Sequence, residues 1–209
     1  MPSIHSFGIF FTAALILAVT PGPGIFYVLT RSLSGGRRDG IASSFGTALG
    51  GLAHVLASAL GLSAILATST LAFSIIKWIG AVYLVYLGLR MLVSQNIDIQ
   101  YESFDRTNTR RIFIQGMTTE ILNPKTALFF LAFLPQFINP QGPIVLQFLI
   151  LGSISVFLNT NVDLLVATFA GSIGQRLKES LRLRRGQSLL SGCALIALGM
   201  YIALADGPQ

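Results

Sequence analysis

Three charged side chains lie well inside long apolar stretches of the chain, far from their ends. Glu120 and Lys125 lie in the stretch from about 112 to 137, and Asp163 lies in the stretch from about 144 to 173. If these stretches cross a membrane, each charge is costly there, and such residues line transport pathways or pair with one another. Lys125 could neutralise a substrate carboxylate or form a fixed ion pair. Burial disfavours the charged form of a carboxyl group, which suits a proton carrier or a ligand for a substrate ammonium group.

Two proline motifs also fall inside apolar stretches. They are Thr20-Pro21-Gly22-Pro23-Gly24 in the first stretch and Asn123-Pro124-Lys125 in the fourth. Because proline has no backbone N–H, Pro21 frees the carbonyl of Leu17, and Pro124 frees that of Glu120. In hydrocarbon, unpaired backbone groups persist only when they are buried in protein or line a wet cavity. A single proline indicates a packing kink, whereas the doubled Pro-Gly favours an unwound turn that offers carbonyls to cations and amides to carboxylates.

The remaining polar candidates are His54, in the second apolar stretch, and Asn161, in the polar patch that includes Asp163. His54 could titrate near physiological pH or form one structural hydrogen bond with a neighbouring helix. His5 is the only other histidine and Cys193 is the only cysteine. A metal site needs several clustered ligands, so we expect no metal, no cofactor and no catalytic residues.

Six apolar stretches make up most of the 209 residues, and they lie at about 7–29, 41–67, 71–93, 112–137, 144–173 and 188–205. The chain is 53% hydrophobic and only 11% charged, with a mean hydropathy of +0.72. A membrane-spanning helix needs about 20 apolar residues. We therefore predict an all-α integral membrane protein with six transmembrane helices in one domain, residues 1–209, with no room for a separate soluble domain.

The basic residues predict the orientation of this domain. All lysines and arginines except Lys77 and Lys125 lie after the first, third or fifth apolar stretch or in its last residues: Arg31, Arg37, Arg38, Arg90, Arg106, Arg110, Arg111, Arg176, Lys178, Arg182, Arg184 and Arg185. By the positive-inside rule these loops are cytoplasmic, so both termini face outward. The same rule explains the net charge of +6 without nucleic-acid binding. Since the first basic residue is Arg31, the first stretch does not begin like a signal peptide, and we expect it to be retained.

This topology makes the first three spans, about 1–93, begin on the opposite side of the membrane from the last three, about 112–209. We therefore predict two inverted halves, each opening with a broken span. Interrupted helices at corresponding positions of two halves indicate a transport site. The glycine-rich segment 46–51 predicts a face for close helix packing.

These motifs resemble the amino-acid exporter superfamily of lysine exporters and homoserine/threonine exporters, and are most similar to the second branch. The resemblance is carried by Thr20–Pro23, Arg31–Gly40, Gly46–His54, and Asn123–Lys125 with its tail Phe129–Phe137. It implies a bacterial inner-membrane exporter driven by the proton gradient, often dimeric. We expect a small amino-acid substrate, protons and the lipid bilayer as partners, with a homodimer possible. Gly51 stands where many relatives carry an acid, so Glu120 or Asp163 would have to couple protons here.

The leading hypothesis is alternating-access export of a small amino acid, with the two broken turns meeting near the midplane. Backbone groups and Lys125 would hold the carboxylate, and Asp163 or Glu120 would take the amine or the proton. Export of an inorganic or metal cation is an alternative, although the clustered ligands for it are missing. An intramembrane enzyme lacks a supporting motif, and a structural subunit would not need two broken, charged helices.

Overall fold

A computed structural model describes residues 4–93, 108–179 and 181–204, and the regular structure in these residues is helical. In chain order the elements are α1 (Ile4–Val19), α2 (Pro23–Gly35), α3 (Arg37–Ala57), η1 (Ser58–Leu62), α4 (Ser63–Thr68), α5 (Thr70–Val93), α6 (Thr109–Ile121), α7 (Pro124–Leu128), η2 (Phe129–Phe133), η3 (Leu134–Phe137), α8 (Ile144–Glu179) and α9 (Leu181–Leu204). The all-α prediction is confirmed. Most of the polar stretch expected after α5 lies outside the described residues.

Both predicted helix breaks are present. The helix α1 ends at Val19, and α2 begins at Pro23 after a bend of 44°. The helix α6 ends at Ile121, and α7 begins at Pro124. In each case proline occupies the first position of the new helix, where its missing N–H costs nothing and its fixed φ suits the helix. The prolines therefore end one helix and start the next.

Three helical stretches are long and apolar enough to cross a membrane: Arg37–Ile65, Leu71–Val93 and Ile144–Ala170. The bent pair α1 and α2 would make a fourth span. The apolar part of α9, Ser188–Leu204, is shorter. The expected fourth span is divided among α6, α7, η2 and η3, because Pro124 and then Pro135 interrupt it. This is a membrane protein with several apolar helices, and a count of six spans stays a prediction.

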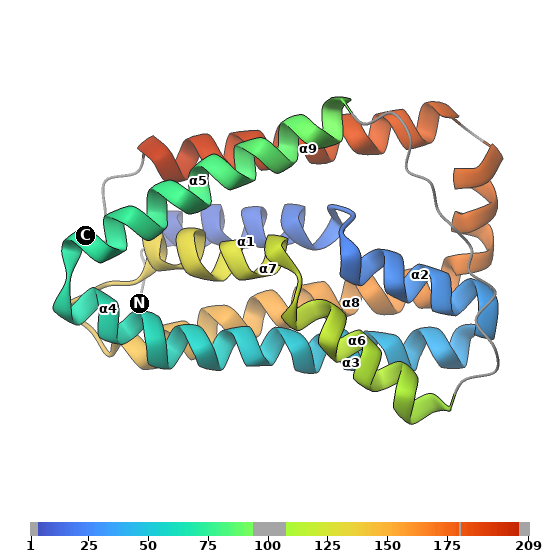
Figure 1. Ribbon diagram of the computed structural model, residues 1–209, viewed down its shortest axis with the longest axis horizontal. Helices are drawn as coiled ribbons and strands as arrows, with labels where there is room; N and C mark the ends of the chain where they lie inside the picture. Colours follow the sequence, from blue (N-terminus) through green and yellow to red (C-terminus); the bar gives the residue numbers. More distant parts are fainter. Residues whose placement is uncertain (1–3, 94–107, 180, 205–209) are drawn as a thin grey trace.

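The chain runs back and forth along one long axis (Figure 1). The helices α5 and α9 lie side by side as one pair, and α3 lies against both α6 and α8. The start of α1 and the end of α9 are at the same end of the molecule, and both helix breaks lie near the middle of its length. This arrangement brings the two proline motifs to a similar depth.

Glycines let α3 and α6 approach closely. A methyl group on Gly46 would collide with the backbone carbonyl of Phe113, and one on Gly50 would lie 2.6 Å from the carbonyl oxygen of Met117. On the facing helix, a methyl group on Gly116 would lie 2.8 Å from the carbonyl oxygen of Ser43. Small residues permit such backbone contact between helices in membranes. The predicted packing face of α3 thus fixes the position of α6.

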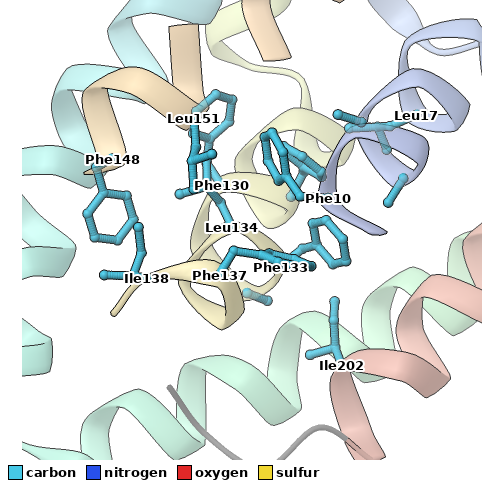
Figure 2. Packing of buried hydrophobic residues seen from close by; sticks show 14 of the residues in the cluster. Phe10, Leu17, Phe130, Phe133, Leu134, Phe137, Ile138, Phe148, Leu151 and Ile202 are labelled. Carbon is cyan, nitrogen blue, oxygen red and sulfur yellow. The ribbon is translucent and has the colours of Figure 1, made fainter. Parts of the chain in front are cut away.

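The hydrophobic core lies beyond the breaks, around η2 and η3 (Figure 2). Phe133 packs against Phe137 with ring centroids 4.8 Å apart, and Phe10 of α1 contacts Phe137 at 5.6 Å. Leu151 of α8 and Ile202 of α9 close the cluster from other sides. Offset and edge-to-face rings fill such a core densely. The core holds the second half of the expected fourth span against α1, α8 and α9.

The outer face of α5 is apolar. Leu71, Trp78, Val82 and Val93 are each more than half exposed. Soluble monomers rarely show such a continuous apolar face, whereas a helix in contact with lipid requires one. The surface of the helix therefore agrees with its apolar length.

Candidate functional site

Lys125 joins the two helix breaks. Its Nζ donates to the carbonyl of Leu17 at 3.0 Å and to that of Thr20 at 2.8 Å. The Leu17 carbonyl is the group that Pro21 was expected to free. The side chain of Lys125 is only 6% exposed, and the two hydrogen bonds compensate part of the cost of burying its charge. The cation at the second break therefore binds the carbonyls exposed by the first.

Glycine at the first break makes room for this contact. A methyl group on Gly22 would lie 3.2 Å from Cε of Lys125 and 3.3 Å from Nζ. A methyl group on Gly24 would lie 2.5 Å from Oε2 of Glu120. Both glycines of the Pro-Gly-Pro-Gly motif thus lie against charged side chains of the second break, Lys125 and Glu120.

Glu120 is buried, with 3% of its surface exposed, and donors reach both of its carboxylate oxygens. Asn123 Nδ2 donates to Oε2 at 3.0 Å, and Thr126 Oγ1 donates to Oε1 at 2.6 Å. Asn123 also caps α7, because its Oδ1 accepts from the backbone N–H of Lys125 at 3.1 Å. Asn123 and Thr126, on either side of Pro124, thereby hold the Glu120 carboxylate in place.

His54 contacts the carbonyl exposed by the second break, which also accepts from the backbone N–H of Asn123 at 3.1 Å. Its Nε2 lies 3.0 Å from the carbonyl oxygen of Glu120, the group that Pro124 was expected to free. Since a carbonyl can only accept, Nε2 carries the hydrogen. The imidazole ring also stacks on Phe130, with centroids 5.9 Å apart. His54 therefore makes the hydrogen bond to a neighbouring helix that was one of its two expected roles.

Asp163 lies at the α3–α8 contact and is completely buried. Thr47 Oγ1 is 2.7 Å from Oδ2 and is also 2.9 Å from the carbonyl oxygen of Ser44. Asn159 Nδ2 is 3.5 Å from Oδ2, at the outer limit of a hydrogen bond. In the described part of the chain, Oδ1 has no hydrogen-bond partner. The charges of Lys125 and Glu120 both act on this carboxyl group.

A small cavity of about 20 Å³ lies among these groups. Its polar lining comes from Thr47, Glu120, Thr126, Ser155 and Asn159. The buried Ser155 hydroxyl has no hydrogen-bond partner among the described residues. The cavity has room for about one water molecule and not for an amino acid. The conformation is therefore closed around the site.

A larger cavity of about 220 Å³ lies between α1 and α9, on another side of α1. Its lining is mostly apolar, and no charged side chain contributes to it. The hydroxyls of Thr12 and Thr20, which line it, donate to carbonyls of α1 itself. We therefore place the polar chemistry at the smaller cavity.

The structure brings together most of the residues singled out in the sequence. Glu120, Asn123, Lys125 and His54 form one hydrogen-bonded group with the first break. Asp163 contacts Thr47 and Asn159, which line one cavity with Glu120. Asn161 lies elsewhere: it is exposed, and its Nδ2 donates to the carbonyl of Phe157 in its own helix at 2.7 Å.

Sequence reasoning missed four polar residues that line the cavity: Thr47, Thr126, Ser155 and Asn159. Helical spacing could have identified Asn159, because residues i and i+4 share a face and Asp163 is four residues further on. Thr47 was not considered as a site residue because its segment, 46–51, was interpreted only as a packing face.

A second polar cluster joins α2 to α6 on the other side of the break from the aromatic core. Arg31 is 3% exposed, and its Nη2 donates to Oε1 of Gln115 at 2.6 Å. Tyr27 donates its hydroxyl to the carbonyl of Ile112 at 2.9 Å. These contacts hold α2, which follows the first break, against α6, which precedes the second break.

No group of three or more His, Cys, Asp or Glu side chains able to hold a metal ion occurs within the described ranges. The acids of the site instead accept hydrogen bonds from hydroxyl and amide donors. These groups suit an organic substrate with charged and hydrogen-bonding ends.

Comparison with known proteins identifies one family. Residues 15–206 match the family described as LysE type translocator. The homoserine/homoserine lactone efflux protein of Salmonella typhimurium strain LT2 is 34% identical over 163 residues, covering 78% of this chain and 77% of that protein. An uncharacterized membrane protein of Vibrio cholerae is 28% identical over 202 residues, covering 97% and 98%.

A further membrane protein, from Bacillus subtilis, is 28% identical over 211 residues, covering 97% of this chain and all of its own length. No solved structure matches the chain. Proteins of the matched family are translocators rather than enzymes. With the family match spanning nearly the whole sequence, the chain belongs to the LysE type translocators.

Proposed function

We propose that this translocator is a secondary active exporter of a small amino acid or amino-acid derivative, exchanged for protons by alternating access. The observation that carries the proposal is the meeting of the two helix breaks at one buried polar group. Lys125 from the second break binds carbonyls of the first, and Glu120 lies against Gly24. Broken helices that meet at charged side chains are typical of transporter substrate sites.

Glu120 is the proposed ligand for the substrate ammonium group. Glu120 lines the cavity together with Thr126, and its carboxylate accepts from Asn123 and Thr126, so an ammonium group in the cavity would add a third donor. The Salmonella relative is named for both homoserine and homoserine lactone. These two compounds share the α-ammonium group, whereas the lactone has no free carboxylate. The ammonium ligand is therefore the part of the site that both would use.

The first turn of α2 and Lys125 are the proposed ligands for a substrate carboxylate. Gly22 precedes α2 and provides no side-chain cap, and the first turn of a helix favours an anion. At α7, by contrast, Asn123 caps the helix. Lys125 has three N–H donors, of which two are used by the carbonyls of α1.

Transport requires the closed site to open. Because the cavity of about 20 Å³ is too small for an amino acid, α2 and α6 must separate or the core beyond the breaks must loosen. The helices α1 and α6, which begin the two expected halves, start at opposite ends of the molecule (Figure 1). This supports inverted halves that rock about the site.

We further propose that the protein lies in the bacterial inner membrane with both termini outside, as the basic loops suggest. A homodimer is part of the same proposal.

Efflux from cells preloaded with a panel of labelled amino acids tests the function. We expect faster loss of one or a few amino acids from cells with the protein, and this loss should be sensitive to a protonophore. Variants Lys125→Ala and Asp163→Asn should abolish it while remaining in the membrane. If no amino acid leaves faster, although the protein is verified in the membrane, the proposal is wrong; accelerated loss of a metal or inorganic cation would support the alternative.

A further inference from the structure

We propose that Asp163 carries the coupling proton, that Glu120 remains ionised, and that the Thr47 hydroxyl links the charge of Asp163 to the substrate cavity. This inference rests on the proposed function and assigns separate roles to its two acids. It follows from the hydrogen-bond donors that reach each carboxyl group.

Glu120 is surrounded as an anion. Each of its oxygens accepts from a neutral donor, Asn123 Nδ2 or Thr126 Oγ1. Its Oε2 also lies beside Gly24, at the start of α2, where the helix dipole favours negative charge. A carboxylate with donors on both oxygens is stabilised in its charged form. Both oxygens of Glu120 are therefore already supplied with donors in this conformation.

Asp163 is surrounded as a neutral acid. Its Oδ2 has Thr47 as its close partner, and its Oδ1 has no partner in the residues that the structure describes. The side chain is fully buried. A buried carboxylate with one oxygen left without a donor is strongly disfavoured, and protonation removes that cost. The geometry therefore fits a proton on Asp163.

Thr47 can serve either state of Asp163. Its hydroxyl has one hydrogen and two nearby acceptors, the carbonyl of Ser44 and Oδ2 of Asp163. When Asp163 is protonated, its O–H can donate to Thr47, which then donates to Ser44. When Asp163 is ionised, the Thr47 hydrogen must turn to Oδ2. One rotation of a hydroxyl thus accompanies each proton bound or released.

The same hydroxyl lies between Asp163 and the cavity. Thr47 and Asn159 line the cavity, and both contact Asp163, whose own side chain is fully buried. A proton that reaches or leaves Asp163 from the cavity therefore passes these two groups. Only an O–H bond forms or breaks: the proton comes from water on one side of the membrane and returns to water on the other.

Other charged and titratable groups lie on the elements packed around Asp163, including Arg37, Arg38 and Asp39 in the first turn of α3. From the second break, Lys125 and Glu120 act on it electrostatically. On α3, His54 is bonded to the Glu120 carbonyl. On α2, Tyr27 and Arg31 are bonded to α6. On α8 itself, Asn159 is the neighbouring polar group.

Reconstituted vesicles separate proton coupling from substrate binding. The probe is labelled homoserine, or the amino acid that the cell panel identifies. Two assays are compared: uptake driven by a pH gradient, and counterflow against unlabelled substrate without a gradient. We expect Asp163→Asn to reduce gradient-driven uptake to the level of empty vesicles and to slow counterflow far less. We expect Glu120→Gln to abolish both.

The variant Thr47→Val keeps the shape of the side chain and removes the hydroxyl. Because an ionised Asp163 then loses its nearest donor, proton release becomes harder, and the pH of half-maximal gradient-driven uptake should rise by about one to two units. Thr47→Ser should restore the wild-type profile. Thr160→Val is the matched control, since the Thr160 hydroxyl donates only to Val156 in its own helix.

The outcomes are distinct. Wild-type vesicles without counterflow would contradict the proposed function itself. If wild-type counterflow is present, two results would overturn the assignment of the proton to Asp163. One is gradient-driven uptake by Asp163→Asn; the other is a Glu120→Gln variant that keeps counterflow and loses its response to the gradient. An unchanged pH profile in Thr47→Val would overturn the role of Thr47.

Discussion

The substitution Gly50→Ala tests whether close contact between α3 and α6 positions Glu120. A methyl group there would lie 2.6 Å from the carbonyl oxygen of Met117 and 2.8 Å from Cβ of Glu120. Both atoms belong to α6, and the first is backbone, which cannot rotate away. Since ordinary contact begins at 3.4 Å, α6 would have to move by about 0.8 Å.

The magnitude follows from two opposing effects. Overpacking of this kind costs about 1–3 kcal/mol, while alanine gains roughly 1 kcal/mol over glycine inside a helix. The net destabilisation should therefore not exceed about 2 kcal/mol. Transport should suffer more, because a displacement near 1 Å at a binding site can cost about a hundredfold in rate.

The assay compares thermal unfolding in detergent with counterflow in vesicles for three alanine variants. Gly8→Ala has no atom within 4 Å of the new methyl group and reports helix propensity alone. Gly51→Ala meets Val156 Cγ2 at 3.0 Å, a side chain that can yield. We expect counterflow to fall in the order Gly8, Gly51, Gly50. If Gly50→Ala matches Gly8→Ala in both stability and transport, the α3–α6 contact does not position the site.

Two further predictions concern stability. Lys125→Met keeps the length of the side chain but loses both bonds to the carbonyls of α1, so we expect destabilisation of about 2–4 kcal/mol by thermal unfolding; an unchanged melting temperature would mean that Lys125 does not join the breaks. Gln115→Leu removes the acceptor 2.6 Å from Arg31 Nη2, so we expect a loss of about 1–3 kcal/mol. Gln115→Glu should retain stability, and equal melting temperatures for these two variants would contradict this role of the Gln115 oxygen.

Local features of the fold could be predicted from the sequence. Pro21 and Pro124 mark the positions where the helices break, and the i−4 rule identifies the freed carbonyls of Leu17 and Glu120. Both carbonyls accept hydrogen bonds from side chains in the structure. The apolar stretch expected at 71–93 corresponds closely to α5.

Contacts between helices could not be predicted in the same way. That Lys125 binds the Leu17 carbonyl and His54 the Glu120 carbonyl depends on how α1, α3 and α7 pack, which one sequence does not specify. Asn161 was predicted rather than Asn159 because the rotation of the helix was not considered. A residue two positions from Asp163 lies on another face of the helix, whereas a residue four positions away lies on the same face. The fourth apolar stretch has enough length for a span, but its prolines divide it into short helices.

The central claim is that a substrate ammonium binds Glu120 where the two helix breaks meet. Counterflow of labelled homoserine and homoserine lactone, together with the amino acids found in the cell panel, tests this claim most directly in wild-type and Glu120→Gln vesicles. The expected result is counterflow of at least one of these compounds by the wild-type protein and none by Glu120→Gln, with equal melting temperatures of the two proteins. Wild-type counterflow that persists unchanged in Glu120→Gln would contradict the claim.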